Sequence, residues 1–323
     1  MAETIESALR QTYPRVEVIV VDDGSTDRSW EVIRSFGDRI TPERLPRNGG
    51  ASAARNRGFT LSSGAFVMFL DADDVLAPDA VAALVAAVRD RPGAIAFCEW
   101  RRLACVDALW VQRPAEVPLP AAGADHLRGW IEELSWIPPC AVLWRRDDFE
   151  RSAGWDESLS LNDDGDLMMG ALASRMRLVQ AEGGTAYYRY HGSARLTLST
   201  QIFSREKLQS QQRVFDKLAA RLELWGRLRE YADSLALAYH RVALLAYTQG
   251  FHELGRACEN RAERLGGRRA VSRTVVGRVL TTILGMGRKE QLAQWLARRG
   301  VMTRTRRIAI QRARKVASTV ANR

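Results

Sequence analysis

Short apolar blocks alternate with amphipathic segments along the first hundred residues of the chain. The apolar blocks, bounded by turn-forming residues, predict buried strands at 16–21, 40–45, 65–70 and 94–99. The segments between them carry apolar residues at helical spacing and predict helices at 27–36, 50–62 and 78–90. Strands that alternate with helices favour a mostly parallel sheet covered on both faces. We therefore expect an α/β fold.

The pattern changes after residue 100. Residues 100–113 are expected to be extended, with a hairpin as one arrangement, and the proline-rich stretch 114–120 predicts a loop. From residue 203 onward the pattern is helical, which sets a boundary near residue 200. The most apolar stretch, 235–247, contains a histidine and an arginine and is shorter than the ~20 residues that a membrane span needs. It therefore predicts a buried helix.

Charge is distributed unevenly along the chain. Residues 268–323 contain 15 Lys and Arg and one acid, a net charge of +14; the whole chain carries +10, so residues 1–267 carry −4. Apolar residues, including Trp295, lie at helical spacing within this segment. A basic amphipathic segment can bind an anionic membrane surface, and a solvated tail is the alternative. We expect three parts: an α/β domain at 1–200, a helical region at 201–267 and a basic amphipathic tail at 268–323.

Two of the predicted strands end in acidic clusters. Asp71 and Asp73 follow the strand at 65–70, and Asp22 and Asp23 follow the strand at 16–21. The carboxyl ends of strands in an open α/β sheet border the ligand site. Carboxylates at such an edge suit Mg²⁺ or Mn²⁺, which prefer oxygen ligands and often bridge to substrate phosphates. A polar turn after a buried strand is the alternative for either cluster taken alone.

A glycine-rich segment with arginines lies between these two strands. Residues 47–58 have the sequence R-N-G-G-A-S-A-A-R-N-R-G, and the small residues at the start of the predicted helix permit close backbone approach to a phosphate. The helix carries Arg55 and a second arginine, and a guanidinium can hold a phosphate with two hydrogen bonds. Gly24 permits a sharp turn after the first acidic cluster, and Ser25 or Thr26 can cap the helix that follows.

The ordered motifs V-D-D-G-S-T-D, N-G-G-A-S-A-A-R-N-R-G and F-L-D-A-D-D resemble those of the inverting glycosyltransferases of family 2, which have the GT-A fold. Farther along the chain, G-W-D-E-S-L and N-D-D-G-D-L resemble that family's acidic catalytic motif, and Y-R-Y-H-G-S resembles the segment that closes its catalytic domain. The resemblance covers roughly residues 4–195 and rests on the order and joint presence of motifs that are weak one by one.

This resemblance implies a metal-dependent transfer of a sugar, with inversion, from a nucleotide-diphosphate sugar to a hydroxyl acceptor. The expected donor is a UDP-sugar, and the expected cofactor is Mn²⁺ or Mg²⁺. The expected acceptor is a glycan or a lipid-linked acceptor in polysaccharide or envelope glycan synthesis. The implied metal ligands are Asp73 and His191, and the implied donor-site residues are Asp22, Asp23, Asn48, Arg55, Asn56 and Asp71.

The catalytic base is expected among the acids of the N-D-D-G-D-L segment. The family usually has Glu-Asp where this chain has Asp163 and Asp164, and the second position aligns with Asp164, which we take as the base. Asp163 and Asp166 remain alternatives, because a helix that starts here can use one of these acids as its cap. Three tryptophans are either platforms for a sugar ring or part of the core: Trp136, Trp144 and Trp155.

The start of the chain departs from the family pattern. Members begin with a buried strand that helps to hold the nucleotide base, whereas Met1 falls inside the helix that follows such a strand. Either the true start lies upstream or this form lacks a central strand. Loss of that strand is expected to weaken folding or donor binding, because it removes hydrogen bonds of the sheet and exposes its neighbours.

The sequence argues against one other function, a dinucleotide-binding oxidoreductase, and leaves two others open. A dinucleotide-binding oxidoreductase would carry G-x-G-x-x-G after its first strand, and this chain has none. A nucleotidyltransferase and a catalytically impaired family member acting as a binding or scaffold module remain alternatives. No nucleic acid is expected as a partner, since the basic tail lacks interleaved aromatic residues. The four cysteines lack C-x-x-C spacing and no signal peptide is visible, which favours a cytoplasmic protein, either free or peripheral on the inner face of the membrane.

Overall fold

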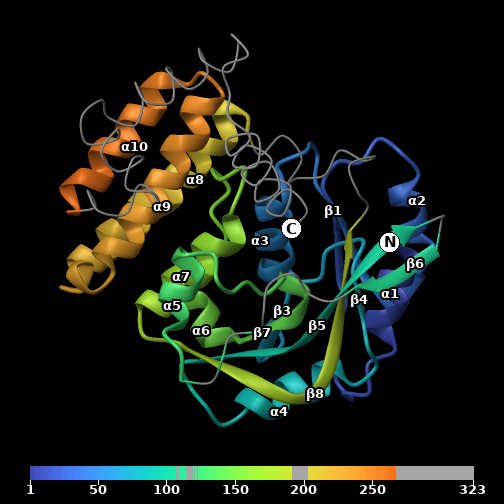
Figure 1. Ribbon diagram of the computed structural model, residues 1–323. Helices are drawn as coiled ribbons and strands as arrows, with labels where there is room; N and C mark the ends of the chain where they lie inside the picture. The colour runs from blue at the N-terminus through green and yellow to red at the C-terminus, as the bar shows by residue number, and fades with distance from the viewer. Residues whose placement is uncertain (107–108, 114–118, 120, 122, 191–202, 267–323) are drawn as a thin grey trace. The chain divides into compact units, whose positions relative to one another are not determined.

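The structure, a computed structural model, describes residues 1–106, 109–113, 119, 121, 123–190 and 203–266. The chain divides into two compact units. The sheet unit consists of residues 1–130, 134–159 and 163–192. The helical unit consists of 131–133, 160–162 and the chain from residue 193 onward, of which 203–266 are described. Figure 1 shows the strands of the first unit and the long helices of the second.

The N-terminal part of the sheet unit contains two parallel strands. Helix α1 (Ala2–Leu9) precedes strand β1 (Ile19–Asp22), and helix α2 (Ser29–Arg34) and the 3-10 turn η1 (Gly37–Arg39) lead to strand β2 (Thr41–Arg44). Helix α3 (Ala51–Leu61) follows. Strands β1 and β2 pair in parallel along four residues. A small core of Ile5, Ile33 and Ile40 lies beneath them.

The predicted strands and helices of this region are confirmed, but neither Ser25 nor Thr26 caps α2, whose N-cap is Arg28. Gly24 makes the predicted turn, with a φ of 70° that favours glycine. Ser25 and Thr26 lie within this turn, and the helix begins only at Ser29. The side chain of Asp27 accepts the hydrogen bond from the Ser29 amide at 2.9 Å. The longer turn therefore moves the start of the helix beyond the reach of the predicted caps.

A six-stranded sheet forms the centre of the sheet unit. Its strands are β3 (Phe66–Met68), β4 (Val75–Leu76), β5 (Ala94–Val106), β6 (Leu109–Arg113), β7 (Val142–Arg145) and β8 (Arg177–Tyr190). They lie in the order β3-β7-β5-β8-β4, and β6 pairs with the end of β5 in the predicted hairpin. Helix α4 (Ala80–Val88) packs against β5 and β8 (Figure 1).

This sheet is mixed rather than mostly parallel. Strands β5 and β8 run parallel, whereas β7 is antiparallel to β3 and β5, and β4 is antiparallel to β8. The pattern of the first hundred residues could not predict this pairing, because β7 and β8 lie beyond the point where strands and helices alternate regularly. The predicted α/β class, with helices around a central sheet, is confirmed.

Four helical elements follow the hairpin: α5 (His126–Ile131), η2 (Pro139–Ala141), α6 (Arg146–Arg151) and α7 (Asp163–Ala173).

An aromatic cluster fixes the elements that carry the acidic strand ends. The ring centroid of Phe149 on α6 lies 4.7 Å from Phe59 on α3, 5.1 Å from Phe69 and 5.8 Å from Trp144 on β7. Tilted and edge-on contacts of this kind stabilise cores. The cluster therefore holds α3 and the end of β3 in fixed positions.

The described part of the helical unit contains three helices: α8 (Arg205–Leu224), α9 (Leu228–Thr248) and α10 (His252–Arg264). The apolar stretch predicted as a buried helix lies in α9, where Leu235, Ala236 and Ala238 are fully buried. A polar network joins the three helices, because Asp216 accepts hydrogen bonds from the Tyr239 hydroxyl at 2.7 Å and from Arg261 Nε at 2.6 Å. The helical pattern predicted from residue 203 is thus confirmed over this range.

Among the described residues, no helix is both long and apolar enough to cross a membrane. All four cysteines are free. The predicted basic tail at 268–323 lies outside the described residues, and the predicted division of the chain at residues 200 and 267 stays a prediction.

Candidate active site

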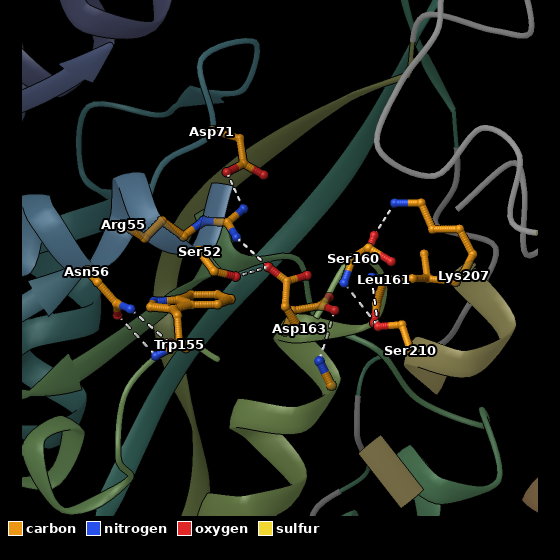
Figure 2. Close-up of polar contacts among 12 residues, drawn as sticks. Ser52, Arg55, Asn56, Asp71, Trp155, Ser160, Leu161, Asp163, Lys207 and Ser210 are labelled. Atoms are coloured by element: carbon orange, nitrogen blue, oxygen red, sulfur yellow. Dashed lines mark hydrogen bonds and ion pairs between the residues drawn. The ribbon is translucent and has the colours of Figure 1, made fainter. Parts of the chain in front are cut away.

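The guanidinium of Arg55, on helix α3, lies between two carboxylates from different elements (Figure 2). Its Nη2 donates to Asp71 Oδ1 at 2.6 Å, and its Nη1 donates to Asp163 Oδ2 at 2.9 Å. Ser52, one turn earlier on α3, donates its hydroxyl to the same Asp163 oxygen at 3.0 Å. The Arg55 side chain is only 12% exposed. Because the pairs are shielded from water, they hold the ends of β3 and α7 together firmly.

Trp155 lies beneath this guanidinium. Arg55 Cζ is 4.3 Å from the ring centroid, a distance at which the aromatic face attracts a cation. Asn56 fixes the backbone of Trp155: its Oδ1 accepts from Trp155 N at 3.2 Å, and its Nδ2 donates to Trp155 O at 2.9 Å and to Glu157 Oε1 at 2.8 Å. These bonds occupy the amide of Asn56. The structure therefore places Asn56 in support of the segment that carries Trp155.

Three acids follow strand β3, and their environments differ. Asp71 is paired with Arg55 and its side chain is 35% exposed, and Asp73 is partly exposed. Asp74 is fully buried, and its Oδ1 accepts the backbone amide of Arg189 on β8 at 2.8 Å. Burial and then the nearby charge of Asp71 raise the pKa of Asp74 well above its usual value. Asp74, which the sequence did not single out, thus anchors the acidic turn to the sheet.

Asp164, the predicted base, lies in the first turn of α7 beside Asp163 but has different partners. Trp136 Nε1 donates to Asp164 Oδ2 at 2.7 Å, and the Gly165 amide donates to Asp164 Oδ1 at 2.8 Å. Burial and then the charge of Asp163 raise the pKa of Asp164 to about 6. A carboxyl group with a pKa near the operating pH is well matched to general base catalysis.

The other two candidate bases are held more tightly. Asp163 receives hydrogen bonds from Arg55 and Ser52 on the same oxygen, which tie its carboxylate to helix α3. Asp166 is only 4% exposed. Asp164 also borders a small cavity with largely apolar walls, which include Trp130, Ile137, Leu167 and Met168. This environment favours Asp164 as the acid that exchanges a proton.

Trp136 stands out among the three candidate sugar platforms. Trp144 and Trp155 are 2% and 4% exposed and belong to the core. Trp136 is partly exposed, and its ring meets Trp100 on β5 and Tyr188 on β8 edge-on, at centroid distances of 5.3 Å and 5.4 Å. The sheet therefore fixes the indole that donates to Asp164. The sequence named Trp136 but held no signal that linked it to the base.

The acids at the end of β1 are bound by the protein's own groups. Asp23 accepts from the amide of Gly49 at 2.7 Å through Oδ1 and from the amide of Gly50 at 2.8 Å through Oδ2. Asp22 is 3% exposed and pairs with Arg44 at 3.0 Å. The amides at the start of α3, which we predicted to favour a phosphate, are thus paired with a carboxylate of the same chain.

Two further predicted residues lie at the margin of this arrangement. Asn48 is exposed in the turn before α3. An added Cβ on Gly24 would lie 2.9 Å from the backbone of Asn48, so the glycine lets the β1 turn approach this segment closely. His191, the second predicted metal ligand, lies outside the described residues.

The groups at the end of β3 fit a hard divalent cation. Asp71 and Asp73 offer partly exposed carboxylates, the oxygen ligands that Mg²⁺ and Mn²⁺ prefer. Within the part of the chain that the structure describes, no group of three or more His, Cys, Asp or Glu side chains could hold a metal. A cation held by one or two carboxylates completes its shell with water and substrate phosphates.

Residues 1–151 match the family model described as Glycosyl transferase family 2. Residues 1–151 thus carry the sequence of a family 2 glycosyltransferase domain. The matched region contains Arg55, Asp71 and Asp73, and it ends before Asp163 and Asp164. The resemblance inferred from the sequence is therefore confirmed, whereas the roles of single residues stay predictions.

Curated relatives match over parts of their length. The chain is 43% identical over 72 residues to the UDP-Glc:alpha-D-GlcNAc-diphosphoundecaprenol beta-1,3-glucosyltransferase WfaP of Escherichia coli. This match covers 22% of this chain and 29% of that protein. It is 26% identical over 219 residues to the uncharacterized glycosyltransferase EpsJ of Bacillus subtilis, which covers 65% of this chain and 62% of that protein. The chain thus spans less than two thirds of the length of these relatives.

One solved structure is similar in fold to most of this chain. The crystal structure of GalNAc-T7 with UDP, GalNAc and Mn²⁺ matches with a TM-score of 0.53 at 15% identity, over 79% of this chain and 51% of that one. At this identity the likeness concerns the fold alone, and it confirms the predicted GT-A-type α/β architecture.

Proposed function

We propose that the protein transfers a sugar from a nucleotide-diphosphate sugar to a hydroxyl acceptor, with inversion at the anomeric carbon. The observation that carries this proposal is Asp164, whose pKa is raised to about 6 and whose carboxylate is oriented by Trp136. Asp164 takes the proton of the acceptor hydroxyl, and the hydroxyl oxygen attacks the anomeric carbon as the diphosphate leaves. One such displacement inverts the configuration, whereas retention through a covalent intermediate needs two.

The donor side of the proposed site is built around Arg55. Its guanidinium pairs with Asp71 and with Asp163. One arginine therefore links the proposed donor side of the site to the helix that carries the proposed base. We assign Asp71 to the donor ribose or the metal. We assign Asp22 and Asp23 to contacts with the base and ribose of the donor. In the same proposal, Asn48 and Asn56 support the donor site from the start of α3 and from its first turns.

The proposed cofactor is Mn²⁺ or Mg²⁺. Asp73 would hold it, with Asp71 beside it and His191 as a further candidate ligand. When bound, such a cation neutralises the charge of the leaving diphosphate as a Lewis acid. The carboxylates at the end of β3 are kept in place for this role by the hydrogen bond between the Asp74 carboxylate and β8.

The names of similar proteins narrow the proposed substrates. WfaP is named for a UDP-glucose donor and a diphosphoundecaprenol-linked acceptor, and the GalNAc-T7 structure contains UDP and Mn²⁺. We therefore propose a UDP-sugar donor and a glycan or lipid-linked acceptor in envelope glycan synthesis. A lipid-linked acceptor would lie in a membrane. The net charge of +14 on residues 268–323 would hold the enzyme at the inner face of such an anionic membrane.

The membrane part of the proposal can be tested separately from catalysis. The full chain is expected to sediment with anionic vesicles at low salt and to be released as salt rises, because the Debye length shrinks to about 3 Å at 1 M. A chain lacking 278–323 should stay in solution and still act on a soluble acceptor. Failure of the full chain to bind anionic vesicles at low salt would contradict the membrane proposal alone.

The decisive test of the function is a donor screen. Release of nucleoside diphosphate is measured from a panel of nucleotide sugars, with Mn²⁺, with Mg²⁺ and after removal of metal by a chelator. Asp73→Ala is expected to abolish metal-dependent release while its melting temperature stays close to that of the parent protein. The matched control is Asp90→Ala, which removes an exposed acid after α4 and should retain full activity.

Two outcomes of the same screen would support the alternatives. Donor binding without turnover of any nucleotide sugar would indicate a binding or scaffold module. Formation of a nucleotide sugar with release of pyrophosphate would indicate a nucleotidyltransferase. Full activity of Asp73→Ala would overturn the assignment of the metal ligand.

A further inference from the structure

The hydroxyl of Thr4, on helix α1, reaches the turn that carries two of the acids after β3. Thr4 Oγ1 donates to the carbonyl of Ala72 at 2.9 Å, and Ala72 lies between Asp71 and Asp73. Helix α1 and this turn belong to the same sheet unit, in which α1 packs beside β4 (Figure 1). Thr4 is only 4% exposed, so its hydroxyl depends on a protein partner rather than on water.

The acids after β3 form a four-residue turn, and Thr4 binds the central peptide group of this turn. The Asp74 amide donates to the Asp71 carbonyl at 3.0 Å and closes the turn. The two common forms of such a turn differ by a flip of the peptide group between the second and third residues, which here are Ala72 and Asp73. One of these forms requires a positive φ at the third residue, and Asp73 does not have one.

The orientation of this central peptide group decides where the Asp73 carboxylate points. A peptide group is planar, so the Ala72 carbonyl and the Asp73 amide turn together. A flip would bring Asp73 into the left-handed region, which residues other than glycine seldom adopt. The first acid of the turn is paired with Arg55, and the last accepts a backbone amide of β8. The bond from Thr4 therefore holds the middle of a turn whose two ends are held by other elements.

We propose that Thr4 is a positioning residue for Asp73: its hydroxyl holds the Ala72 carbonyl, and this bond keeps the Asp73 carboxylate in the direction in which it binds a divalent cation. This inference rests on the proposed role of Asp73 as the metal ligand. Loss of a group that orients a metal ligand from outside the coordination shell typically lowers metal affinity by roughly 10- to 100-fold. Removal of one buried hydroxyl is therefore expected to have a measurable effect on the cation.

A matched control lies just beyond the end of α1. Gln11 donates to the Ala77 carbonyl at 2.8 Å and accepts from the Val81 amide at 2.9 Å. Both partners lie beyond the acidic turn, at the end of β4 and at the start of α4. Gln11→Met removes both of these bonds, whereas Thr4→Val keeps the shape of the side chain and removes one. The two variants thus loosen neighbouring parts of the same segment, and only Thr4→Val affects the turn.

Hydrogen exchange tests the state of the turn without metal or donor. In Thr4→Val, exchange is expected to accelerate at the Asp74 amide, which closes the turn, and to stay unchanged at the Val81 amide. Gln11→Met should do the reverse, because it removes the acceptor of the Val81 amide and leaves the turn intact. This pair of amides therefore shows which part of the segment each variant releases.

Binding of Mn²⁺ alone, followed in the full chain by electron paramagnetic resonance of the free ion, tests the consequence for the cation. Thr4→Val should raise the apparent dissociation constant by about tenfold or more. Gln11→Met should lose at least as much thermal stability and keep the parent affinity. Thr4→Ser, which restores the hydroxyl, should recover most of the affinity. If Thr4→Val does not fold, Thr4→Ala removes the same hydroxyl and is more favourable in a helix.

The outcomes separate this inference from the proposed function. If Thr4→Val binds Mn²⁺ as the parent does, or if its Asp74 amide keeps its protection, Thr4 is purely structural and the inference is wrong. Equal losses of Mn²⁺ affinity in Thr4→Val and Gln11→Met would also overturn it, because the loss would then follow stability. If the parent binds no Mn²⁺ while the Asp74 amide exchanges faster in Thr4→Val, the hold of Thr4 on the turn stands and the proposed metal ligand fails.

Discussion

Two acidic clusters look alike in the sequence and differ in the structure. At the end of β1, the carboxylate of Asp23 is bound by the amides of Gly49 and Gly50, and Asp22 is paired with Arg44. After β3, Asp71 shares Arg55 with Asp163 from α7, and its side chain remains 35% exposed. The first cluster joins the turn after β1 to the start of α3. The second joins the end of β3 to the start of α7 through the guanidinium of Arg55.

The partners of each carboxylate therefore decide its use. A carboxylate that accepts two backbone amides stabilises the local fold. In a carboxyl group that lies in a partly apolar site beside another acid, such as Asp164, the pKa is raised to about 6. Such a group can accept and release a proton during the reaction. We expect substitutions at the β3–α7 cluster to affect transfer more than stability, and substitutions at the β1 cluster to do the reverse. The predictions below test this difference.

Apart from loss of the proposed metal ligand Asp73, the largest effect on transfer is expected for Asp164→Asn. The amide keeps the size of the side chain but cannot accept the acceptor's proton, so turnover should fall by about 10³-fold, within the range for loss of a general base. Donor affinity, measured by calorimetry, should stay unchanged. Asp163→Asn serves as the matched comparison and should be less impaired; if it is the inactive variant instead, the base is Asp163.

Arg55→Met is expected to have the next largest effect. The substitution keeps most of the side-chain volume and leaves Asp71 and Asp163 facing each other without their shared cation. Transfer should fall by about 10²-fold through misplacement of both carboxylates, and stability should fall by about 2 kcal/mol. Steady-state kinetics and urea unfolding measure the two losses. Arg57→Met, which removes an exposed ion pair with Glu43 from the same helix, is the control and should change neither quantity much.

Trp136→Phe should have a moderate effect that depends on pH. In the parent protein, kcat/KM should fall as pH drops through about 6, because Asp164 becomes protonated and can no longer act as a base. The Trp136 hydrogen bond lowers the pKa of Asp164, so its loss should move this acid limb to higher pH. The phenyl ring keeps contact with Trp100 and Tyr188, which preserves packing. An acid limb that stays in place would show that the indole does not act on the base.

The smallest effect on transfer is expected for Asp23→Asn. The asparagine amide group would face a backbone amide, donor against donor, at Gly49 or Gly50. Stability should fall by about 1 kcal/mol, which corresponds to a drop of about 3 °C in melting temperature. Transfer should fall less than in Asp164→Asn, Arg55→Met or Trp136→Phe. A loss of turnover as large as that of Asp164→Asn, with unchanged stability, would erase the contrast between the two clusters.

The sequence predicted the elements of the fold where the pattern is regular. The strands and helices up to residue 100 follow a simple alternation, and each was found close to its expected place. The mixed pairing of the sheet was missed because strand direction for β7 depends on how the chain returns after a long irregular stretch. Local periodicity contains no information about that return.

The site shows the same limit. The acids at strand ends were recognisable because an apolar run that ends in carboxylates is a local pattern. The pairing of Arg55 with Asp163 and the indole of Trp136 beside Asp164 join residues far apart in the chain. Each of these contacts is set by packing of distant elements, so a single sequence holds no signal for it.

The central claim, that Asp164 removes a proton from the attacking hydroxyl, is tested most directly by chemical rescue. Azide attacks an anomeric carbon without having to lose a proton, so it needs no general base. With Asp164→Asn, added azide is expected to restore release of nucleoside diphosphate from the donor and to yield a glycosyl azide of inverted configuration, whereas the parent enzyme gains little. If azide fails to rescue Asp164→Asn but rescues Asp163→Asn, or if the product retains the donor configuration, the account is contradicted.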